Sequence, residues 1–279
     1  MPAIKPKILD TVYRNNGEEI GKVGGIILNS TNMEKEELVE KLIFGIEKIN
    51  EDSIDTLIIE ELSLLSKEDI QLIQKRTKLK VLDGKKVLIF FLPIVLNRIY
   101  KGLKEDLKDK EVLILGDEEE TIKEVIEALH KEVRFVTLVG ANKDSIESIS
   151  KYILEKTGLS LFTSKNIDKI LANYSIIINL KDNNYIDINR VKKEALVFDL
   201  SIGKILYKTI KNKRRPIVIE EFIFKIDMET RWIESLVYSH VYEYFCEFNS
   251  KDLKGLIVNG NINNIEDFID YGIRNKGRL

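Results

Sequence analysis

The chain has 279 residues, 44% of them hydrophobic and 32% charged, a composition typical of globular proteins and far from that of disordered ones. Lys and Arg together number 44 against 46 Asp and Glu, a formal charge of -2, so the composition gives no support for nucleic-acid binding. The one local basic run, at residues 211–215, is interpreted as a solvated loop. The single cysteine, Cys246, excludes an intrachain disulfide, and two histidines are too few for a His-rich metal site.

No apolar signal-peptide segment is present at the N-terminus, and we expect a cytoplasmic location. The most apolar stretch, residues 87–99, is about half the length that crosses a bilayer, and it contains Pro93 and Asn97. We therefore expect a buried helix there and no association with a membrane.

The first 82 residues alternate strand and helix signals, which predicts an N-terminal α/β domain over 1–82 with a mainly parallel sheet. The expected elements are a hairpin of strands 8–13 and 22–28 turning at 15–17, a helix capped at 30–32 and ending near 50, a strand over 54–59, a helix starting at 66–69 and a strand over 78–82. Asp83-Gly84 ends this domain. A long apolar helix follows and is expected to bridge the two halves over 83–110.

Residues 111–210 show a clearer alternation. Strands are expected over 111–115, 134–139, 160–163, 175–180 and, as the last parallel strand, 195–200, with helices over 118–131, 144–157 and 166–171. The strands are apolar without a polar alternate, which indicates burial on both faces. This pattern predicts an α/β fold whose second half is a Rossmann-like, doubly wound parallel sheet.

The final segment, 211–279, is expected to be helical and to pack back across both domains. Residues 217–219 are β-prone, whereas 228–248 are predicted to form a long aromatic helix. Short helices are expected at 251–253 and 266–271, around a loop that contains Gly255, Asn259, Gly260 and Asn261.

The turn after the first strand of the Rossmann-like half is acidic where a dinucleotide site needs glycines. It reads Gly116-Asp117-Glu118-Glu119-Glu120-Thr121, so only the first glycine of a G-x-G-x-x-G pattern is present. Acids in a first helical turn stabilise the helix dipole and oppose a bound phosphate. Unconventional binding of NAD or NADP around Gly116 stays open as the alternative.

Two further positions bear on a cofactor. The second strand lacks the acid that holds the ribose in NAD sites; Lys143 follows it, where a lysine favours a 2′-phosphate or is simply solvated. Asp199 ends the strand over 195–200 and is expected to point toward the ligand crevice. Glu60 at a strand end, Lys85 at the start of the bridging helix and His240 among acidic neighbours are weaker signals, and no G-x-S-x-G motif accompanies them.

Several short motifs carry a family resemblance: Asp83-Gly84 before the long helix, the strand ending in Gly116, and Leu-Val-Phe-Asp-Leu-Ser at 196–201. At the chain's end, 233–235, 258–260 and 271–277 match loosely. Together they resemble the shikimate-dehydrogenase-like two-domain oxidoreductases, and more narrowly the long-chain acyl-carrier-protein reductases and the related C-terminal module of plant wax-synthesis proteins. That resemblance implies a glycine-rich nucleotide turn and a nucleophilic cysteine. Here the turn is acidic and Arg231 stands at the cysteine position, so a non-catalytic relative is implied.

Three hypotheses follow. The chain is a ligand-binding or scaffold relative of the reductases, with a small molecule bound in the interdomain cleft and no conventional cofactor. Alternatively, it is an NADP-dependent oxidoreductase that acts on an acyl or small carbonyl substrate. A third alternative is an interaction protein that works as a homodimer through the aromatic residues of 232–248.

Overall fold

The computed structural model describes residues 5–14, 16–28, 33–51, 53–164, 167–183, 185–210, 216–227 and 231–273. Several expectations fall outside these ranges: the helix cap at 30–32, Asn15 of the hairpin turn, the basic run at 211–215, the start of the stretch 228–248 and the last matched residues, 274–277.

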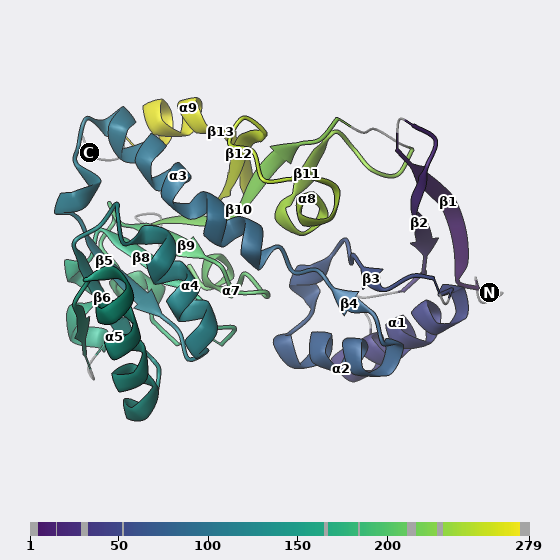
Figure 1. The fold of residues 1–279 in the computed structure, drawn as a ribbon, viewed down its shortest axis with the longest axis horizontal. Coiled ribbons are helices and arrows are strands. Elements are labelled where there is room, and N and C mark those ends of the chain that lie inside the picture. The colour runs from purple at the N-terminus through teal and green to yellow at the C-terminus, as the bar shows by residue number, and fades with distance from the viewer. Residues whose placement is uncertain are drawn as a thin grey trace.

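The N-terminal part is a β-hairpin followed by a small α/β unit (Figure 1). Its elements are β1 (Lys7–Tyr13) and β2 (Glu19–Gly25), which pair antiparallel, then α1 (Lys35–Ile49), β3 (Thr56–Leu57), α2 (Lys67–Thr77) and β4 (Lys80–Val81), with β3 and β4 parallel. A capping box starts α2: Ser66 Oγ accepts from Asp69 N–H, and Asp69 accepts from Ser66 N–H at 2.7 Å. The order and type of these elements match the sequence-based expectation, although β2 lies three residues earlier than expected and β3 and β4 have only two residues each. The expected mainly parallel sheet is instead two separate pairs, one antiparallel and one parallel.

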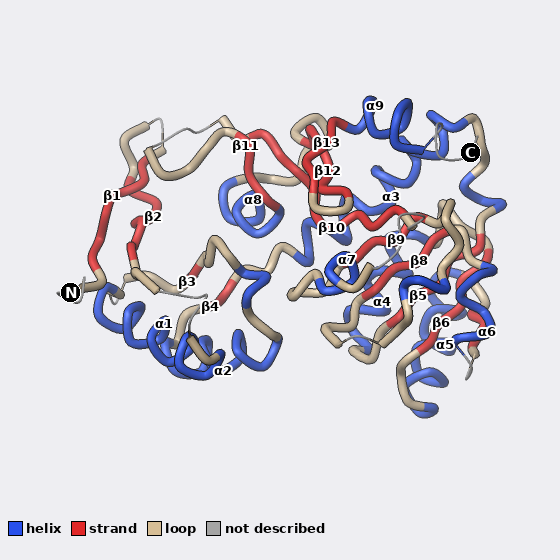
Figure 2. The backbone as a smooth tube through the Cα atoms, turned by 180° about the vertical axis from the view of Figure 1, so that it is seen from behind, coloured by secondary structure: helices blue, strands red, loops and turns tan. Residues whose placement is uncertain are grey.

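The second part is built on one nine-stranded sheet, which Figure 2 shows from behind. Its elements are α3 (Lys85–Leu103), β5 (Glu111–Leu115), α4 (Glu119–Leu129), β6 (Phe135–Val139), α5 (Lys143–Thr157), β7 (Leu161–Thr163), α6 (Ile167–Ile170), β8 (Ile176–Asn179), β9 (Leu196–Asp199), α7 (Ile205–Lys208), β10 (Ile217–Lys225), β11 (Leu236–Tyr238), α8 (Ser239–Phe245), β12 (Leu253–Val258), β13 (Asn261–Asn264), α9 (Ile265–Asp267) and a π-helical turn (Phe268–Ile273).

Six strands of this sheet are parallel, in the spatial order β7-β6-β5-β8-β9-β10. Numbered by their place in the chain, that order is 3-2-1-4-5-6, which is the order of the Rossmann fold. The expected α/β fold class is confirmed. The expectation that 195–200 forms the last parallel strand is wrong, because β10 pairs in parallel beside β9.

Both faces of the sheet are covered, as a parallel sheet requires. Alternate residues of β5 show the division. Val112 and Ile114 pack under α3, α4 and α5, whereas Leu113 and Leu115 pack against the opposite layer, which includes Leu206 of α7. Helix α3 contributes most to the first layer, with nine buried residues between Val87 and Tyr100.

The long helix predicted over 228–248 is wrong. Residues 236–238 form β11 and pair antiparallel with β10, and only residues 239–245 are helical. The predicted helix at 251–253 is also wrong, because β12 begins at Leu253 and extends the sheet beside β10. The turn from β12 to β13 is Asn259-Gly260, with φ of 49° and 77°. That dipeptide is a strong hairpin signal, and it outweighs the helical spacing of the apolar residues around it.

The C-terminal residues therefore mainly extend the sheet, and the short helix α8 is the part of them that contacts both halves of the molecule. Between β13 and residue 273, where the described part of the chain ends, α9 and the π-helical turn are helical, and Ile269 of that turn packs beside Gly102 near the end of α3. Sheet pairing overrides local helical spacing here because each new strand satisfies the open edge of its neighbour.

The junction between the two parts is closely packed. Ile202, in the loop after β9, is buried in the apolar cluster of the N-terminal part. Gly84, which starts α3, has φ of 75° and donates its N–H to Glu243 of α8 at 3.1 Å. The hydroxyl of Tyr244 donates to the carbonyl of Ile20 in β2. The hairpin, the start of α3 and α8 are thereby joined.

The close approach at Gly84 is testable against a matched glycine. Gly84 and Gly158 have φ of 75° and 76°, but a Cβ at Gly84 would overlap Ser239 Oγ and lie 2.6 Å from His240 N, whereas Gly158 has open space. We expect Gly158→Ala to cost about 1 kcal/mol of unfolding free energy and Gly84→Ala about 2 kcal/mol more. Urea unfolding measures both; equal losses would contradict the packing described here.

Candidate functional site at the carboxyl edge of the sheet

In doubly wound sheets, ligands bind outside the carboxyl ends of the strands, where the strand order reverses. That switch point lies here between β5 and β8. The registered neighbours at this edge are Leu115 of β5, Asn179 of β8 and Asp199 of β9. Glu220 of β10 continues the row, because Ile219 is registered with Phe198.

The turn that would hold a phosphate is short and acidic. Gly116 is buried, and a Cβ there would lie 2.9 Å from the Ile122 side chain, so glycine lets the turn pack against α4. Glu118 is the N-cap of α4, at the second glycine position of the dinucleotide pattern. Thr121, at the third, donates its hydroxyl to Glu118 Oε2 at 2.9 Å. The acid is thus held beside the end of the helix.

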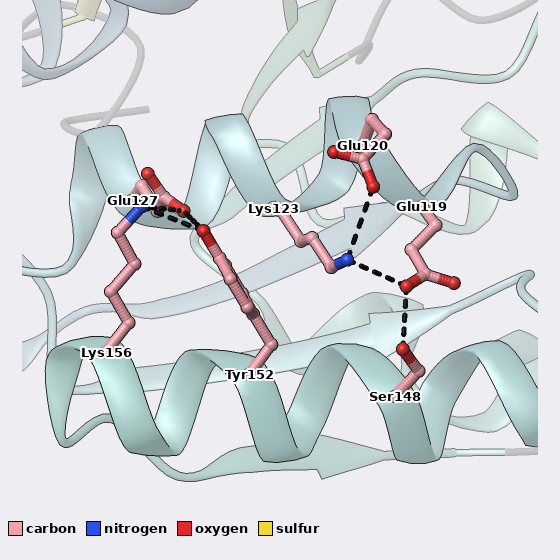
Figure 3. Close-up of polar contacts among 7 residues, drawn as sticks. All are labelled: Glu119, Glu120, Lys123, Glu127, Ser148, Tyr152 and Lys156. Atoms are coloured by element: carbon pink, nitrogen blue, oxygen red, sulfur yellow. Dashed lines mark hydrogen bonds and ion pairs between the residues drawn. The ribbon is translucent and has the colours of Figure 1, made fainter.

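Every acid of this turn has a cation within the protein. Figure 3 shows the outer pair: Lys123 Nζ lies 2.8 Å from Glu119 and 3.3 Å from Glu120, and Ser148 of α5 donates to Glu119. The same helices are joined farther along by Tyr152 and Lys156, which both donate to Glu127. Glu119, together with Glu127 farther along the helix, therefore fastens α4 to α5.

Asp117 is paired across the switch point. Lys181, in the loop after β8, places Nζ 2.8 Å from Asp117 Oδ2, and its side chain is only 8% exposed. The same cation lies 4.4 Å from the centre of the Tyr185 ring. Its backbone N–H and carbonyl both bond to Asn179, at 3.3 and 3.0 Å. The ion pair thus links the loops that follow the two strands between which a dinucleotide would lie.

Glu118 is paired with the N-terminal part instead. Lys67 at the start of α2 and Lys85 at the start of α3 place Nζ 3.3 and 3.7 Å from its carboxylate. Burial alone would raise the pKa of Glu118, but the Thr121 hydroxyl and the two lysines lower it below its usual value. The ionised carboxylate of Glu118 therefore links the turn to α2 in the N-terminal part and to the start of α3.

Asp199 is fully buried and bonds to the neighbouring strand β8 and to the loop that follows β9. Its carboxylate accepts from Asn179 Nδ2 at 2.9 Å, from Ser201 Oγ at 2.6 Å and from Leu206 N–H at 3.1 Å. Lys204 Nζ adds a bond to its carbonyl at 3.0 Å. These bonds shape the loop that places Ile202 in the N-terminal core. In this arrangement the oxygens of Asp199 are directed at protein donors.

Glu220 is buried beside Asp199 without an ion pair in the described part of the chain. It lies at a bulge of β10, and Gly260 N–H donates to it at 2.7 Å. Burial raises the pKa of Glu220 to about 7, and Asp199 adds to the rise, whereas the Gly260 bond and nearby Lys204 and Lys208 oppose it. A buried carboxyl that titrates near neutrality is suited to proton transfer.

The residues predicted from sequence are only partly brought together. Gly116 and Asp199 lie at the same edge of the sheet, separated by β8. Lys143 starts α5 after β6; its side chain is 85% exposed and lies 3.6 Å from Glu147. Sequence reasoning missed Asn179, Lys181 and Glu220. Their signal is a polar residue that ends or interrupts an otherwise apolar strand, as in Ile-Ile-Ile-Asn at 176–179.

Two searches of the described residues concern other kinds of site. They contain no cluster of three or more His, Cys, Asp or Glu that could hold a metal ion. None of their helices is both long and apolar enough to cross a membrane.

No protein-family model and no curated protein matches the chain. Among solved structures, part of the fold is similar to quinate dehydrogenase from Corynebacterium glutamicum in complex with NAD (15% identity, 43% of this chain and 45% of that one, TM-score 0.30). Shikimate dehydrogenase from Aquifex aeolicus (21%, 46% and 47%, 0.31) and L-tryptophan dehydrogenase from Nostoc punctiforme (16%, 63% and 49%, 0.31) are also similar.

The similar region spans less than half the length of each of these three dehydrogenases. Likeness at such TM-scores supports no argument about activity. The fold assignment rests on the strand order of this chain itself.

The raised pKa of Glu220 makes a pH-dependent prediction. Its folded value, about 7, lies above its ordinary 4.5, so the native state binds more protons between these values and loses stability as pH rises through them. We expect the free energy of unfolding of Glu220→Gln to equal that of wild type near pH 5 and to exceed it by about 2 kcal/mol at pH 8. Urea titrations across this range measure it, with Glu221→Gln as the neighbouring control. A pH-independent difference would contradict the assignment.

Proposed function

We propose that this chain is a Rossmann-fold relative of NAD(P)-dependent reductases that lacks conventional dinucleotide binding and redox catalysis, and that serves as a ligand-binding or scaffold protein. The observation that carries this proposal is the acidic turn, whose carboxylates are already paired with Lys67, Lys85, Lys123 and Lys181. The protein's own acids supply the negative charge that a pyrophosphate would bring.

The magnitudes favour this reading over dinucleotide binding. A helix N-terminus stabilises a negative charge by about 0.3–1 kcal/mol. Two like charges about 4 Å apart repel by about 1 kcal/mol in water and about 4 kcal/mol near a protein surface. A pyrophosphate at α4 would meet Asp117 and Glu118 together, and it would have to compete with them for Lys181 and Lys85. The repulsion exceeds what the helix end offers.

The chain also lacks the nucleophilic cysteine that the narrower resemblance, to the acyl-carrier-protein reductases, implies. Arg231 stands at the position implied for the cysteine. Cys246 is half-buried beyond α8, and burial, with Asp252 and Asp227 nearby, raises the pKa of its thiol to about 11. The thiol is therefore protonated at neutral pH, and a protonated thiol is a poor nucleophile for a thioester. Both features support a relative that has lost the reaction.

Thermal unfolding in the presence of cofactors tests the proposal. We expect NAD, NADP, their reduced forms and acyl-coenzyme A, each at about 5 mM, to leave the melting temperature unchanged within about 1 °C, because a ligand without affinity for the native state adds no stability. A saturable rise of several degrees with one dinucleotide would overturn the proposal and favour the alternative, an NADP-dependent oxidoreductase.

The pairing of Glu118 makes a second prediction. Glu118→Gln removes the partner of both Lys67 and Lys85, and we expect a loss of about 1 kcal/mol that shrinks at high salt. Glu120→Gln is the control, since Glu120 lies in the same turn, has a side chain that is 82% exposed and, among the described residues, pairs with Lys123 alone; it should cost less. Urea unfolding at low and high salt measures both variants, and equal losses would contradict a bond between the two parts.

A further inference from the structure

The chain contains two Asn-Gly dipeptides, Asn16-Gly17 and Asn259-Gly260, and they lie in very different surroundings. Asparagine is chemically labile in proteins, and most so before glycine, because glycine has no Cβ to hinder attack by its backbone nitrogen. Each dipeptide is therefore a candidate site of spontaneous modification. The local structure decides which of the two can react in the folded protein.

The reaction closes a ring within the chain. The glycine nitrogen attacks Cγ of the asparagine, a new N–Cγ bond replaces the Cγ–Nδ2 bond, and the glycine amide proton leaves with Nδ2 as ammonia. Water then opens the resulting succinimide at either carbonyl and gives aspartate or isoaspartate. Water is the only co-reactant, and no electrons are exchanged. Ring closure requires the glycine nitrogen and the asparagine Cβ to lie on the same side of the Cα–C bond.

The turn between β12 and β13 holds Asn259-Gly260 in a shape that prevents ring closure. Positive φ at both residues, 49° and 77°, is the mark of a type I′ hairpin turn. In that turn the first residue has ψ of about 30°. This value puts the glycine nitrogen and the asparagine Cβ on nearly opposite sides of the Cα–C bond. The attacking nitrogen therefore points away from Cγ until the turn opens.

Contacts with β10 and α7 keep this turn closed. Asn259 donates its N–H to the carbonyl of Val218 at 2.9 Å, and its Oδ1 accepts the Val218 N–H at 3.2 Å. The Gly260 N–H donates to Glu220 at 2.7 Å, and the Tyr207 ring packs against Gly260. Asn259 is 5% exposed. Opening the turn requires its separation from β10, which costs a share of the global free energy of unfolding.

Asn16-Gly17 lies in the exposed turn of the N-terminal hairpin, where the bonds are local. The Gly17 N–H donates to the carbonyl of Arg14 at 2.9 Å, and Asn16 Oδ1 accepts the Glu18 N–H at 3.0 Å. Asn16 and Gly17 are both exposed, and a Cβ at Gly17 would meet open space. Opening such a turn costs little, because water replaces the broken bonds.

We propose that Asn16 is a site of spontaneous deamidation in the folded protein, and that the turn between β12 and β13 protects Asn259 from the same reaction. Conversion of Asn16 adds a negative charge to the hairpin turn. Conversion of Asn259 follows an opening of its turn, and the extra backbone atom of isoaspartate then prevents Val258 and Asn261 from pairing in their native register. This inference is independent of the proposed function.

Peptide mass spectrometry follows both sites in one sample, because deamidation replaces NH2 by OH and chromatography separates isoaspartate from aspartate. The chain unfolded in urea gives the intrinsic rate of each dipeptide and corrects for the different residues around them. In native buffer near neutral pH, we expect Asn16 to convert within about threefold of its rate in urea. We expect Asn259 to convert at least about tenfold more slowly than in urea.

Two variants and one change of conditions serve as controls. Asn16→Ser should abolish conversion at the hairpin turn and leave the urea midpoint unchanged. Glu220→Gln should leave Asn259 protected, because the glutamine carbonyl still accepts the Gly260 N–H. Urea just below the unfolding midpoint should speed conversion at Asn259 and leave the rate at Asn16 unchanged, since it raises the population of open turns in the sheet.

Conversion of Asn259 in native buffer at its urea rate would overturn the proposal, and so would conversion of Asn16 at least about tenfold below its urea rate. Native conversion at Asn259 that Glu220→Gln abolishes would also overturn it, because the carboxylate would then act as a base for the attacking nitrogen. None of these outcomes bears on the proposed function, which the cofactor titrations test separately.

Discussion

The need to cover both faces of a parallel sheet governs this molecule. Six parallel strands expose apolar side chains on either face, and each face needs a layer of helices or loops. Helix α3 supplies the largest share of one layer, and it is also the segment by which the chain leaves the N-terminal part. Burying α3 therefore brings its first turn, and the N-terminal part with it, to the carboxyl edge of the sheet. The position of Gly84, and the contacts of Ser239 and Glu243 with it, follow from that packing.

The acidic side chains at this edge of the sheet form ion pairs with lysines of the same chain. In a dinucleotide-binding protein of this fold, the backbone N–H groups of the first βα turn bind a phosphate of the cofactor. Here Glu118 and Asp117 stand in that turn, and lysines from three separate segments meet the acids. Individually such half-exposed pairs contribute little to stability. Their effect is one of placement, because they link the turn both to the loop after β8 and to the N-terminal part.

The loop after β9 shows how a buried acid can organise a junction. Asp199 accepts hydrogen bonds from Asn179, Ser201 and Leu206, and so holds the loop in one shape. That shape sends Ile202 into the apolar cluster of the N-terminal part and leaves Lys204 near both Glu220 and His240. Asp199, which the sequence analysis placed in a cofactor site, thus joins two parts of the structure. Glu220, whose pKa is raised by burial, lies beside it.

The sequence by itself determined the alternation of strands and helices from 111 to 200 and the acidity of the first turn. Buried parallel strands are short, wholly apolar runs between amphipathic helices, so they can be recognised from the local sequence alone. Only the tertiary structure decided that 217–225 and 253–264 extend the sheet and that 236–238 leave a helical pattern to pair with β10. It also decided which lysine meets which acid: Lys181 and Asp117 are 64 positions apart. Strand pairing and ion pairing join distant residues, and no local pattern encodes such a partner.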